Sequence, residues 1–264
     1  MSEPARLRLR NLSVSVPVRR LVNALDAEFA AGEFIAILGK NGAGKSLTLQ
    51  TMAGLRPPGG GSVELDNEPL DALDRRSVAR RLALLPQSAG NAFPGQVMDT
   101  VLIGRHPHIG ALLMPSADDR AIARRALDEV ELGSLAERDI DSLSGGELRR
   151  VTIAQCLAQT PAIYLLDEPS NHLDPRHQLS VASLFAEKAK EGATVVAVLH
   201  DINLAQRLAD RVLLLYGDGR WRLGPCGDVM TDTNLSELFD VAIDAVPWRG
   251  SQLFVAGGDG ALDG

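Results

Sequence analysis

A glycine-rich segment, residues 39–46, carries residues suited to binding phosphate. It reads Gly-Lys-Asn-Gly-Ala-Gly-Lys-Ser and matches the G-x-x-x-x-G-K-S pattern of a phosphate-binding loop. Glycines let backbone N–H groups converge on phosphate oxygens, and a following helix adds the positive end of its dipole. In such a loop Lys45 reaches the β- and γ-phosphates, and the Ser46 hydroxyl is a ligand of Mg²⁺. The nucleotide-binding residues expected here are Gly39, Lys40, Asn41, Gly42, Ala43, Gly44, Lys45, Ser46 and Leu47. The alternative is a glycine turn that opens a helix and binds nothing.

Two adjacent carboxylates, Asp167 and Glu168, follow an apolar run and precede Pro169. Successive side chains of a strand point in opposite directions, so the two carboxylates can serve different tasks. We predict that Asp167 is a second ligand of Mg²⁺ and that Glu168 is the general base acting on the attacking water. The alternative is a polar strand end, with Pro169 stopping the ladder.

His200 and Gln87 stand just past the ends of two other predicted strands. Open α/β sheets place ligand groups at the carboxyl ends of their strands. A lone histidine there is more often structural, and Asp201 suits the N-cap of the next helix. Together with the phosphate-binding loop and the carboxylate pair, however, both residues are predicted to be catalytic, with Gln87 also a ligand of Mg²⁺.

A third polar segment, residues 143–147, reads Leu-Ser-Gly-Gly-Glu and is called the LSGGE segment below. By itself it is a short glycine-containing turn at the start of a helix. Ser144 and the amides of Gly145 and Gly146, at a helix N-terminus, form an anion site that lacks an obvious phosphate of its own.

Neither the remaining histidines nor the cysteines indicate a further metal site. His106 and His108 match no closed zinc spacing and have no cysteine nearby, so we predict a surface loop there. Cys156 lies in an apolar helical run and is predicted to be a buried thiol. The only metal expected is the Mg²⁺ that accompanies a nucleotide.

The elements that must position these residues alternate between strands and helices, which predicts an α/β fold with a parallel sheet and crossover connections. Strands are predicted at residues 7–10, 12–16, 34–38, 62–65, 82–85, 163–166, 194–199 and 212–216. Helices are predicted at residues 45–53, 176–191 and 202–209. Between residues 88 and 160 strand patterns nearly vanish and helical ones appear at 97–103, 117–130 and 146–158, which predicts a helical insertion. Residues 257–260 (Gly-Gly-Asp-Gly) are predicted to be disordered.

Composition limits the class of protein. The chain has 264 residues, 45% of them hydrophobic, and a formal charge of −7, which argues against a nucleic-acid partner. The arginines clustered at 75, 76, 80 and 81 are therefore predicted to form a solvated helix face rather than a phosphate-backbone site. Because no stretch approaches the ~18 apolar residues of a membrane span and the N-terminus lacks a secretory pattern, we expect a cytoplasmic chain, soluble by itself.

Taken together, these motifs resemble those of the ATP-binding cassette family over about residues 7–240. In that resemblance residues 39–46 match the Walker A loop, Gln87 the Q-loop, 143–147 the signature, 163–168 the Walker B strand, 170–174 the D-loop and His200 the switch histidine. It implies a P-loop NTPase (RecA-like) core with a mostly parallel sheet, an N-terminal antiparallel β subdomain and an inserted α-helical subdomain. The nucleotide-binding domain would span residues 1–240, with the helical subdomain at about 88–160 and a C-terminal tail at 241–264.

The resemblance also implies function. Family members are ATPases that use ATP and Mg²⁺ and work as head-to-tail dimers, with each ATP held between one chain's Walker A loop and the other's signature. The run Val-Leu-Ile-Gly-Arg-His-Pro-His at 101–108 is similar to a run found in the ATPase subunits of importers for iron-siderophore, haem or cobalamin. We therefore expect a homodimer on the cytoplasmic face of the membrane, bound to transmembrane permease subunits and served indirectly by a substrate-binding protein.

The sequence departs from the family near the adenine. Members usually have an aromatic residue close to position 16 for stacking on the base, and this chain has Val16-Pro17 there. Two outcomes stay open: nucleotide affinity is weakened, or Arg19 or Arg20 stacks on the base instead. We expect poor discrimination between ATP and GTP. Two other function classes stay open: a soluble, non-transport cassette ATPase, and an unrelated P-loop kinase or GTPase. The latter leaves the LSGGE segment unexplained.

Overall fold

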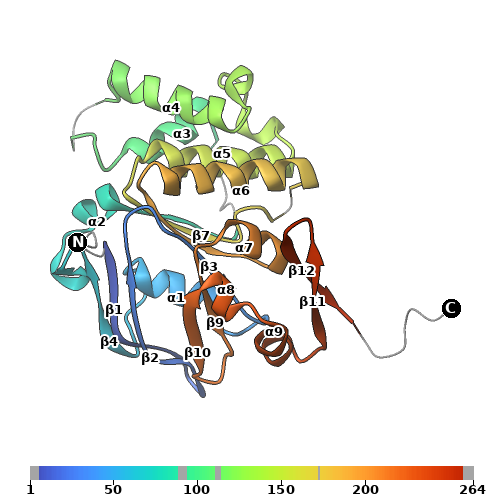
Figure 1. Ribbon diagram of the computed structural model, residues 1–264. Coiled ribbons are helices and arrows are strands. Elements are labelled where there is room, and N and C mark those ends of the chain that lie inside the picture. Colours follow the sequence, from blue (N-terminus) through green and yellow to red (C-terminus); the bar gives the residue numbers. More distant parts are fainter. Residues whose placement is uncertain (1–5, 89–93, 111–113, 172, 258–264) are drawn as a thin grey trace.

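The computed structural model describes residues 6–88, 94–110, 114–171 and 173–257. Its centre is a 6-stranded sheet with the order β10-β9-β3-β8-β7-β6 (Figure 1). Neighbouring strands are parallel except for β9 and β10. The strands are β3 (Phe34–Leu38), β6 (Leu82–Leu85), β7 (Ile163–Asp167), β8 (Thr194–Val198), β9 (Arg211–Leu215) and β10 (Trp221–Pro225). The predicted mostly parallel sheet is confirmed.

A second, antiparallel sheet with the order β2-β1-β4-β5 packs on one side of the first. Its strands are β1 (Leu7–Val16), β2 (Arg19–Phe29), β4 (Gly60–Leu65) and β5 (Glu68–Pro69). Helix α1 (Lys45–Met52) lies between the two sheets, where its Leu49 and Met52 are completely buried. The long strand β2 was missing from the predicted elements.

Helices cover the other face of the central sheet (Figure 1). They are α3 (Val97–Leu102), α4 (Ala117–Glu129), α5 (Gly145–Ala158), α6 (Pro175–Lys190) and α7 (Ile202–Leu208), with α2 (Arg75–Arg81) at the edge beside β6. Among the described residues, 3₁₀ turns at Ile103–Arg105, Gly133–Leu135 and Ile140–Ser142 complete this part, and another, Leu70–Ala72, follows β5 beside the antiparallel sheet. The helical insertion therefore consists of α3, α4 and α5.

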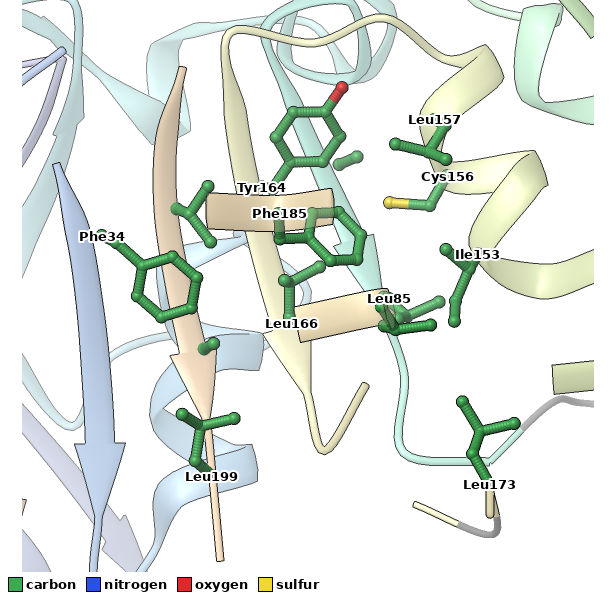
Figure 2. Packing of buried hydrophobic residues seen from close by; sticks show 14 of the residues in the cluster. Phe34, Leu85, Ile153, Cys156, Leu157, Tyr164, Leu166, Leu173, Phe185 and Leu199 are labelled. Atoms are coloured by element: carbon green, nitrogen blue, oxygen red, sulfur yellow. The ribbon is translucent and has the colours of Figure 1, made fainter. Parts of the chain in front are cut away.

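Burial on both faces explains the continuous apolar strands. Phe34 of β3 faces the helical side, whereas its neighbour Ile35 faces the antiparallel sheet. Figure 2 shows the helical side, where Ile153 and Cys156 of α5 lie near Leu166 of β7. Burial raises the pKa of the Cys156 thiol to about 12, in agreement with the predicted buried thiol.

The segment after residue 225 folds back onto the core. It contains α8 (Cys226–Val229), α9 (Asp232–Phe239) and a hairpin of β11 (Ile243–Trp248) and β12 (Ser251–Ala256). Asn203 of α7 binds this hairpin twice: its Oδ1 accepts from the N–H of Phe254 at 2.7 Å, and its Nδ2 donates to the Phe254 carbonyl at 3.1 Å. Residues 243–256, within the segment 241–264 expected to be a C-terminal tail, thus form a hairpin. Residues 258–260 of the predicted disordered stretch lie outside the described residues.

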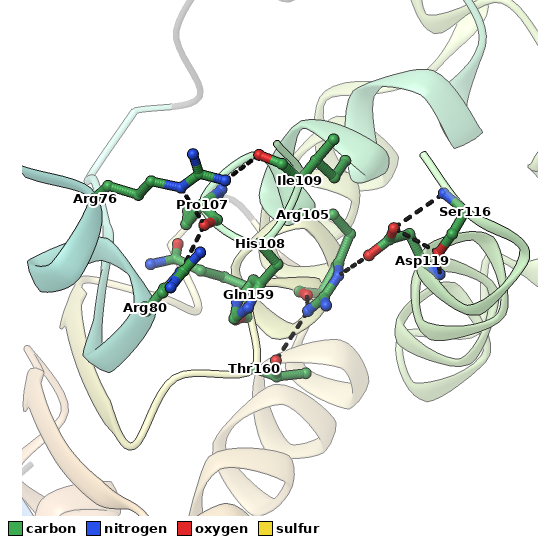
Figure 3. Close-up of polar contacts among 11 residues, drawn as sticks. Arg76, Arg80, Arg105, Pro107, His108, Ile109, Ser116, Asp119, Gln159 and Thr160 are labelled. Carbon is green, nitrogen blue, oxygen red and sulfur yellow. Dashed lines mark hydrogen bonds and ion pairs between the residues drawn. The ribbon is translucent and has the colours of Figure 1, made fainter. Parts of the chain in front are cut away.

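The arginines of α2 keep much of the predicted solvent exposure, since Arg75 and Arg80 are exposed and Arg76 and Arg81 are half-buried, but they also bind backbone carbonyls. Arg76 donates to the carbonyls of Pro107 and Ile109, and Arg80 donates to that of Pro107 at 2.8 Å (Figure 3). Arg75 donates to a carbonyl of the core, at Gly54, over 2.7 Å. Hydrogen bonds to backbone acceptors therefore connect α2 to the segment that follows α3, a function that charge counting does not reveal.

Next to this contact, Arg105 is buried where α3 ends and holds three elements together (Figure 3). Its guanidinium donates to Asp119 Oδ1 at 2.9 Å, to the carbonyl of Ala158 at 2.8 Å and to Thr160 Oγ1 at 2.9 Å. The nearby His108 ring is 2.9 Å from the carbonyl oxygen of Gln159.

No helix within the described ranges is long and apolar enough to cross a bilayer.

Candidate active site

A cavity of about 680 Å³ opens at the carboxyl ends of the parallel strands. Segments that follow β3, β6, β7 and β8 all contribute to it, as the strand order requires. Its lining comprises Val16, Arg19, Leu21, Asn41, Gly42, Gly44, Lys45, Ser46, Leu47, Gln87, Glu168, Asn171 and His200. The cavity thus gathers most of the predicted site residues from four separate parts of the chain.

The phosphate-binding loop has a backbone that requires glycine. Gly42 and Gly44 have φ angles of +78° and +97°, in the left-handed region that other residues rarely adopt. A Cβ on Gly39 would lie 2.5 Å from the carbonyl oxygen of Leu215. Helix α1 begins directly after Gly44, so its N-terminal amides face the cavity and suit an anion.

Lys45 is folded back into this loop. Its ammonium donates to the carbonyl of Gly39 at 2.8 Å and to that of Lys40 at 3.1 Å. Burial lowers the pKa of Lys45, and the carboxylates of Glu168 and Asp167 oppose that shift. The side chain is 6% exposed, which places a cation at the base of the cavity with acceptors that a phosphate can replace.

Asp167 ends β7 below the loop and is buried. The Ser46 hydroxyl hydrogen-bonds to its carboxylate, and burial is the main cause that raises the pKa of Asp167. Its Oδ1 atom has no hydrogen-bond partner within the part of the chain that is described. A buried carboxylate oxygen without a partner, next to a serine hydroxyl, fits the oxygen ligands that Mg²⁺ requires.

Glu168 is fixed by two neighbours. Its Oε1 lies 2.5 Å from Nε2 of His200, and its Oε2 accepts from Nδ2 of Asn171 at 2.9 Å. The residue itself has a φ of 50°, which costs free energy in a non-glycine residue and is typical of functional sites. Asn171 was not among the predicted site residues, although its place three residues after the carboxylate, in the same turn, could have indicated it.

The part of the cavity near Val16, where the adenine is expected, has Arg19 in its lining. Among the described lining residues, His200 is the one with an aromatic ring. Arg19, at the start of β2, donates from Nη2 to the carbonyl of Gly42 at 2.9 Å. Arg20 instead donates to Asn23 Oδ1 at 2.8 Å and does not line the cavity. Of the two arginines predicted to stack on the base, only Arg19 is among the residues that line the cavity.

The LSGGE segment lies apart from the cavity. Ser144 is the N-cap of α5 and forms a capping box with Glu147, donating to its Oε2 at 2.7 Å and accepting from its N–H at 3.3 Å. A Cβ on Gly145 would meet nothing within 4 Å. None of the three predicted residues of this segment lines the cavity, so the two groups of residues predicted to bind phosphate lie apart in one copy of the chain.

A few other predicted residues lie beside the cavity rather than on its surface. Gly39, Lys40, Ala43 and Asp167 do not line it. Lys40 pairs with Asp240 at the end of α9. In the segment 170–174, Asp174 is the N-cap of α6 and accepts from the N–H of His177 at 3.0 Å, whereas His172 lies outside the described residues. Asp201 caps α7 as predicted.

Comparison with known proteins gives consistent matches along nearly the whole chain. The family model described as ABC transporter matches residues 22–171. A hemin import ATP-binding protein of Nocardia farcinica is 40% identical over 255 residues, covering 94% of this chain and 88% of that protein. A solved structure described as an inward-facing, metal-chelate type ABC transporter has a TM-score of 0.83 at 30% identity, covering 97% of this chain and 98% of its own.

A third match concerns assembly. A dimeric ATP-binding cassette in a post-hydrolysis state, bound to ADP and inorganic phosphate, has a TM-score of 0.72 at 29% identity. The similarity covers 83% of this chain and 98% of that one.

Proposed function

The chain belongs to the ABC transporter family and is an ABC-type ATPase, and on that premise we propose that it drives uptake of haem or a related iron chelate. In this proposal two copies form a head-to-tail dimer, bind a separate transmembrane permease and hydrolyse ATP at their shared interface. The chain would act as a peripheral subunit at the cytoplasmic face of the membrane, with a substrate-binding protein delivering the cargo to the permease.

The observation that carries this proposal is the separation of the two groups of residues predicted to bind phosphate. The cavity holds a P-loop, a carboxylate and a histidine, yet the N-terminus of α5 with Ser144 is not part of it. Gly145 leaves open space around that N-terminus, where backbone N–H groups and the helix dipole favour an anion. A second copy, placed head to tail, would bring its α5 to the γ-phosphate bound in the first. The similarity to a dimeric cassette supports that arrangement.

Within the cavity, ATP would replace the internal partners of Lys45. The Lys45 ammonium, which donates to two loop carbonyls in the structure, would donate to the β- and γ-phosphates instead. The amides of the loop would hold the same groups. Ser46 and Asp167, with Gln87, would hold Mg²⁺, which when bound neutralises charge on the phosphates. Asp167 Oδ1, which has no hydrogen-bond partner among the described residues, supports this assignment.

Hydrolysis would use the carboxylate of Glu168. The attacking water would give its proton to Glu168 as its oxygen bonds to the γ-phosphorus and the bond to the β-phosphate oxygen breaks, leaving ADP and phosphate. His200, 2.5 Å from Glu168 Oε1, and Asn171, 2.9 Å from Oε2, would hold the carboxylate toward that water. The strained φ of Glu168 supports a functional rather than a packing role.

The cargo is inferred from relatives alone, because the cassette itself contacts only nucleotide and permease. The relative from Nocardia farcinica is named for hemin import, and the most extensive structural match cited above is of the metal-chelate type. The first favours import, and both favour a metal chelate as the cargo.

The proposal is tested with the chain and its permease in proteoliposomes. We expect ATP-dependent uptake of haem, with ferric siderophore and cobalamin as the alternative cargoes, and loss of uptake in Glu168→Gln. That variant should still bind MgATP and accumulate as a dimer. Full turnover by Glu168→Gln would remove Glu168 as the base, and absence of ATP-driven uptake of any of the three cargoes would overturn the importer assignment.

A further inference from the structure

Arg149, in the second turn of α5, binds four backbone carbonyls with one guanidinium. Its Nη1 donates to Pro86 at 2.6 Å and its Nε to Pro169 at 3.2 Å. Its Nη2 donates to the carbonyls of Asp167 and Glu168, at 3.1 and 2.8 Å. The side chain is 3% exposed. A buried charge held by so many acceptors is strongly oriented, because the planar guanidinium presents its donors in a fixed geometry.

These four carbonyls belong to the parts of the chain that position the chemistry. Three of them form the turn in which Glu168 adopts its φ of 50°, a conformation that persists only if its surroundings impose it. The fourth belongs to Pro86, which directly precedes Gln87. Arg149 therefore fixes the backbone on both sides of the catalytic carboxylate without touching nucleotide itself.

The same helix also begins at Ser144, the N-cap of α5. Under the proposed function, that N-terminus meets the nucleotide of the partner. The N-terminus of α5 then contacts the partner's nucleotide. About one and a half turns further along the helix, Arg149 binds the turn that contains Glu168 of its own chain. A shift of α5 on nucleotide engagement would be passed through Arg149 to the backbone that aims Glu168.

We propose that Arg149 is a positioning residue that couples the two ATP sites of the dimer. Engagement of the partner's nucleotide by α5 sets the Glu168 turn of the same chain, so that each site becomes competent when the other is filled. This inference rests on the proposed shared site and adds the residue that carries the coupling. Hydrolysis by the wild type must then depend sigmoidally on ATP concentration.

The test compares Arg149→Lys with Arg150→Lys in the full-length chain. Arg150 is the neighbouring residue of α5 and donates a single hydrogen bond to the carbonyl of Val130 at 3.0 Å, so it receives the same chemical change without contact to the Glu168 turn. For Arg149→Lys we expect an unchanged MgATP dissociation constant, a kcat lowered ~10-fold or more by misplacement of the base, and a Hill coefficient falling from near 2 toward about 1. Arg150→Lys should match the wild type in all three.

The Hill coefficient distinguishes coupling from stability. A merely structural role would lower the melting temperature and kcat while leaving cooperativity as in the wild type. Arg149→Gln, which removes the charge and keeps an amide with two N–H donors, repeats the measurement with fewer donors than arginine. Hyperbolic ATP dependence in the wild type overturns the inference whether or not either variant folds.

Failure of the inference is separable from failure of the proposed function. If Glu168→Gln remains a single chain with MgATP, the shared site itself is refuted. If Glu168→Gln dimerises and Arg149→Lys hydrolyses ATP with wild-type cooperativity, only the coupling through Arg149 is refuted.

Discussion

Replacing Arg105 by methionine removes a buried cation from the joint between α3, α4 and the end of α5. Methionine is close to the arginine stem in shape, so the main loss is of the guanidinium and its hydrogen bonds to Asp119, Ala158 and Thr160. The carboxylate of Asp119 would stay in place, because Ser116 still donates to it.

The expected loss of stability follows from burial. The side chains of the Arg105–Asp119 pair are 8% and 13% exposed, and breaking a buried pair by removing one partner costs about 3–5 kcal/mol. Because Asp119 keeps its Ser116 partners, we expect the low end, about 3 kcal/mol. At an m-value of about 3 kcal/mol per M, the urea midpoint should fall by roughly 1 M.

The same chain offers a matched control in the exposed pair Arg176–Glu131, whose side chains are 76% and 48% exposed. Arg176→Met should change the free energy of unfolding by about 0–1 kcal/mol, because solvent screens such pairs. A double-mutant cycle with Asp119→Asn should give a coupling to Arg105 of about 1–3 kcal/mol. Equal urea midpoints for Arg105→Met and Arg176→Met would refute the argument from burial.

Three further predictions concern Gly145, Arg19 and Asp119. Gly145→Ala should leave thermal stability unchanged or slightly raised, because its Cβ meets nothing within 4 Å, yet abolish ATP turnover; a fully active variant would contradict the open anion site. Arg19→Ala should weaken nucleotide binding by about 1 kcal/mol in calorimetry while Arg20→Ala does not, with ATP and GTP bound similarly; a strong preference for ATP would contradict it. Hydrogen bonds, chiefly from Ser116, lower the pKa of Asp119 to about 2. This carboxylate therefore stabilises the fold above pH ~4, and in urea titrations the advantage over Asp119→Asn should disappear as the pH falls from about 4 to 2; an advantage that stays constant over that range would contradict it.

The parallel strands of the central sheet were predictable because their signals are local, whereas the antiparallel strand β10 was not among the predicted strands. Residues 34–38 form a continuous apolar run, bounded by glycines, that the structure buries on both faces as β3. Capping residues such as Ser144 and Asp201 mark helix starts within a few positions of themselves. Such patterns depend on neighbours in sequence, and the structure confirms the elements they indicated.

Other features depend on partners far along the chain. Strand β2 is only partly of this kind: the positive φ of Ala24 and the register shifts against β1 interrupt its first half, whereas residues 25–29 alternate between buried apolar and exposed acidic residues, a local signal that was missed. The hairpin of β11 and β12 includes Pro247 and is held by Asn203, which lies 51 residues from Phe254. The arginines of α2 form a partly exposed basic face, as predicted, but their hydrogen bonds to the carbonyls of Pro107 and Ile109 depend on residues about 30 positions away. No local pattern encodes these contacts.

The candidate site divides in the same way. The identities of Lys45, Asp167 and Glu168 could be predicted from motif and strand context. The clamp by Arg149 could not, because its acceptors are backbone carbonyls 18 to 63 residues away, and any residue type supplies a carbonyl. Asn171 lies in the segment 170–174 that resembles the D-loop, but its contact with Glu168 depends on the geometry of the turn.

The central claim is that each active site is completed by Ser144 and its helix from a second copy. The most direct test is the molar mass, by light scattering after size exclusion, of Glu168→Gln and of Glu168→Gln combined with Ser144→Ala, both in MgATP. We predict twice the mass of one chain for the first and the mass of a single chain for the second, with ATP still bound to both. A dimer that forms equally well without the Ser144 hydroxyl, or no dimer in either variant, would contradict the account.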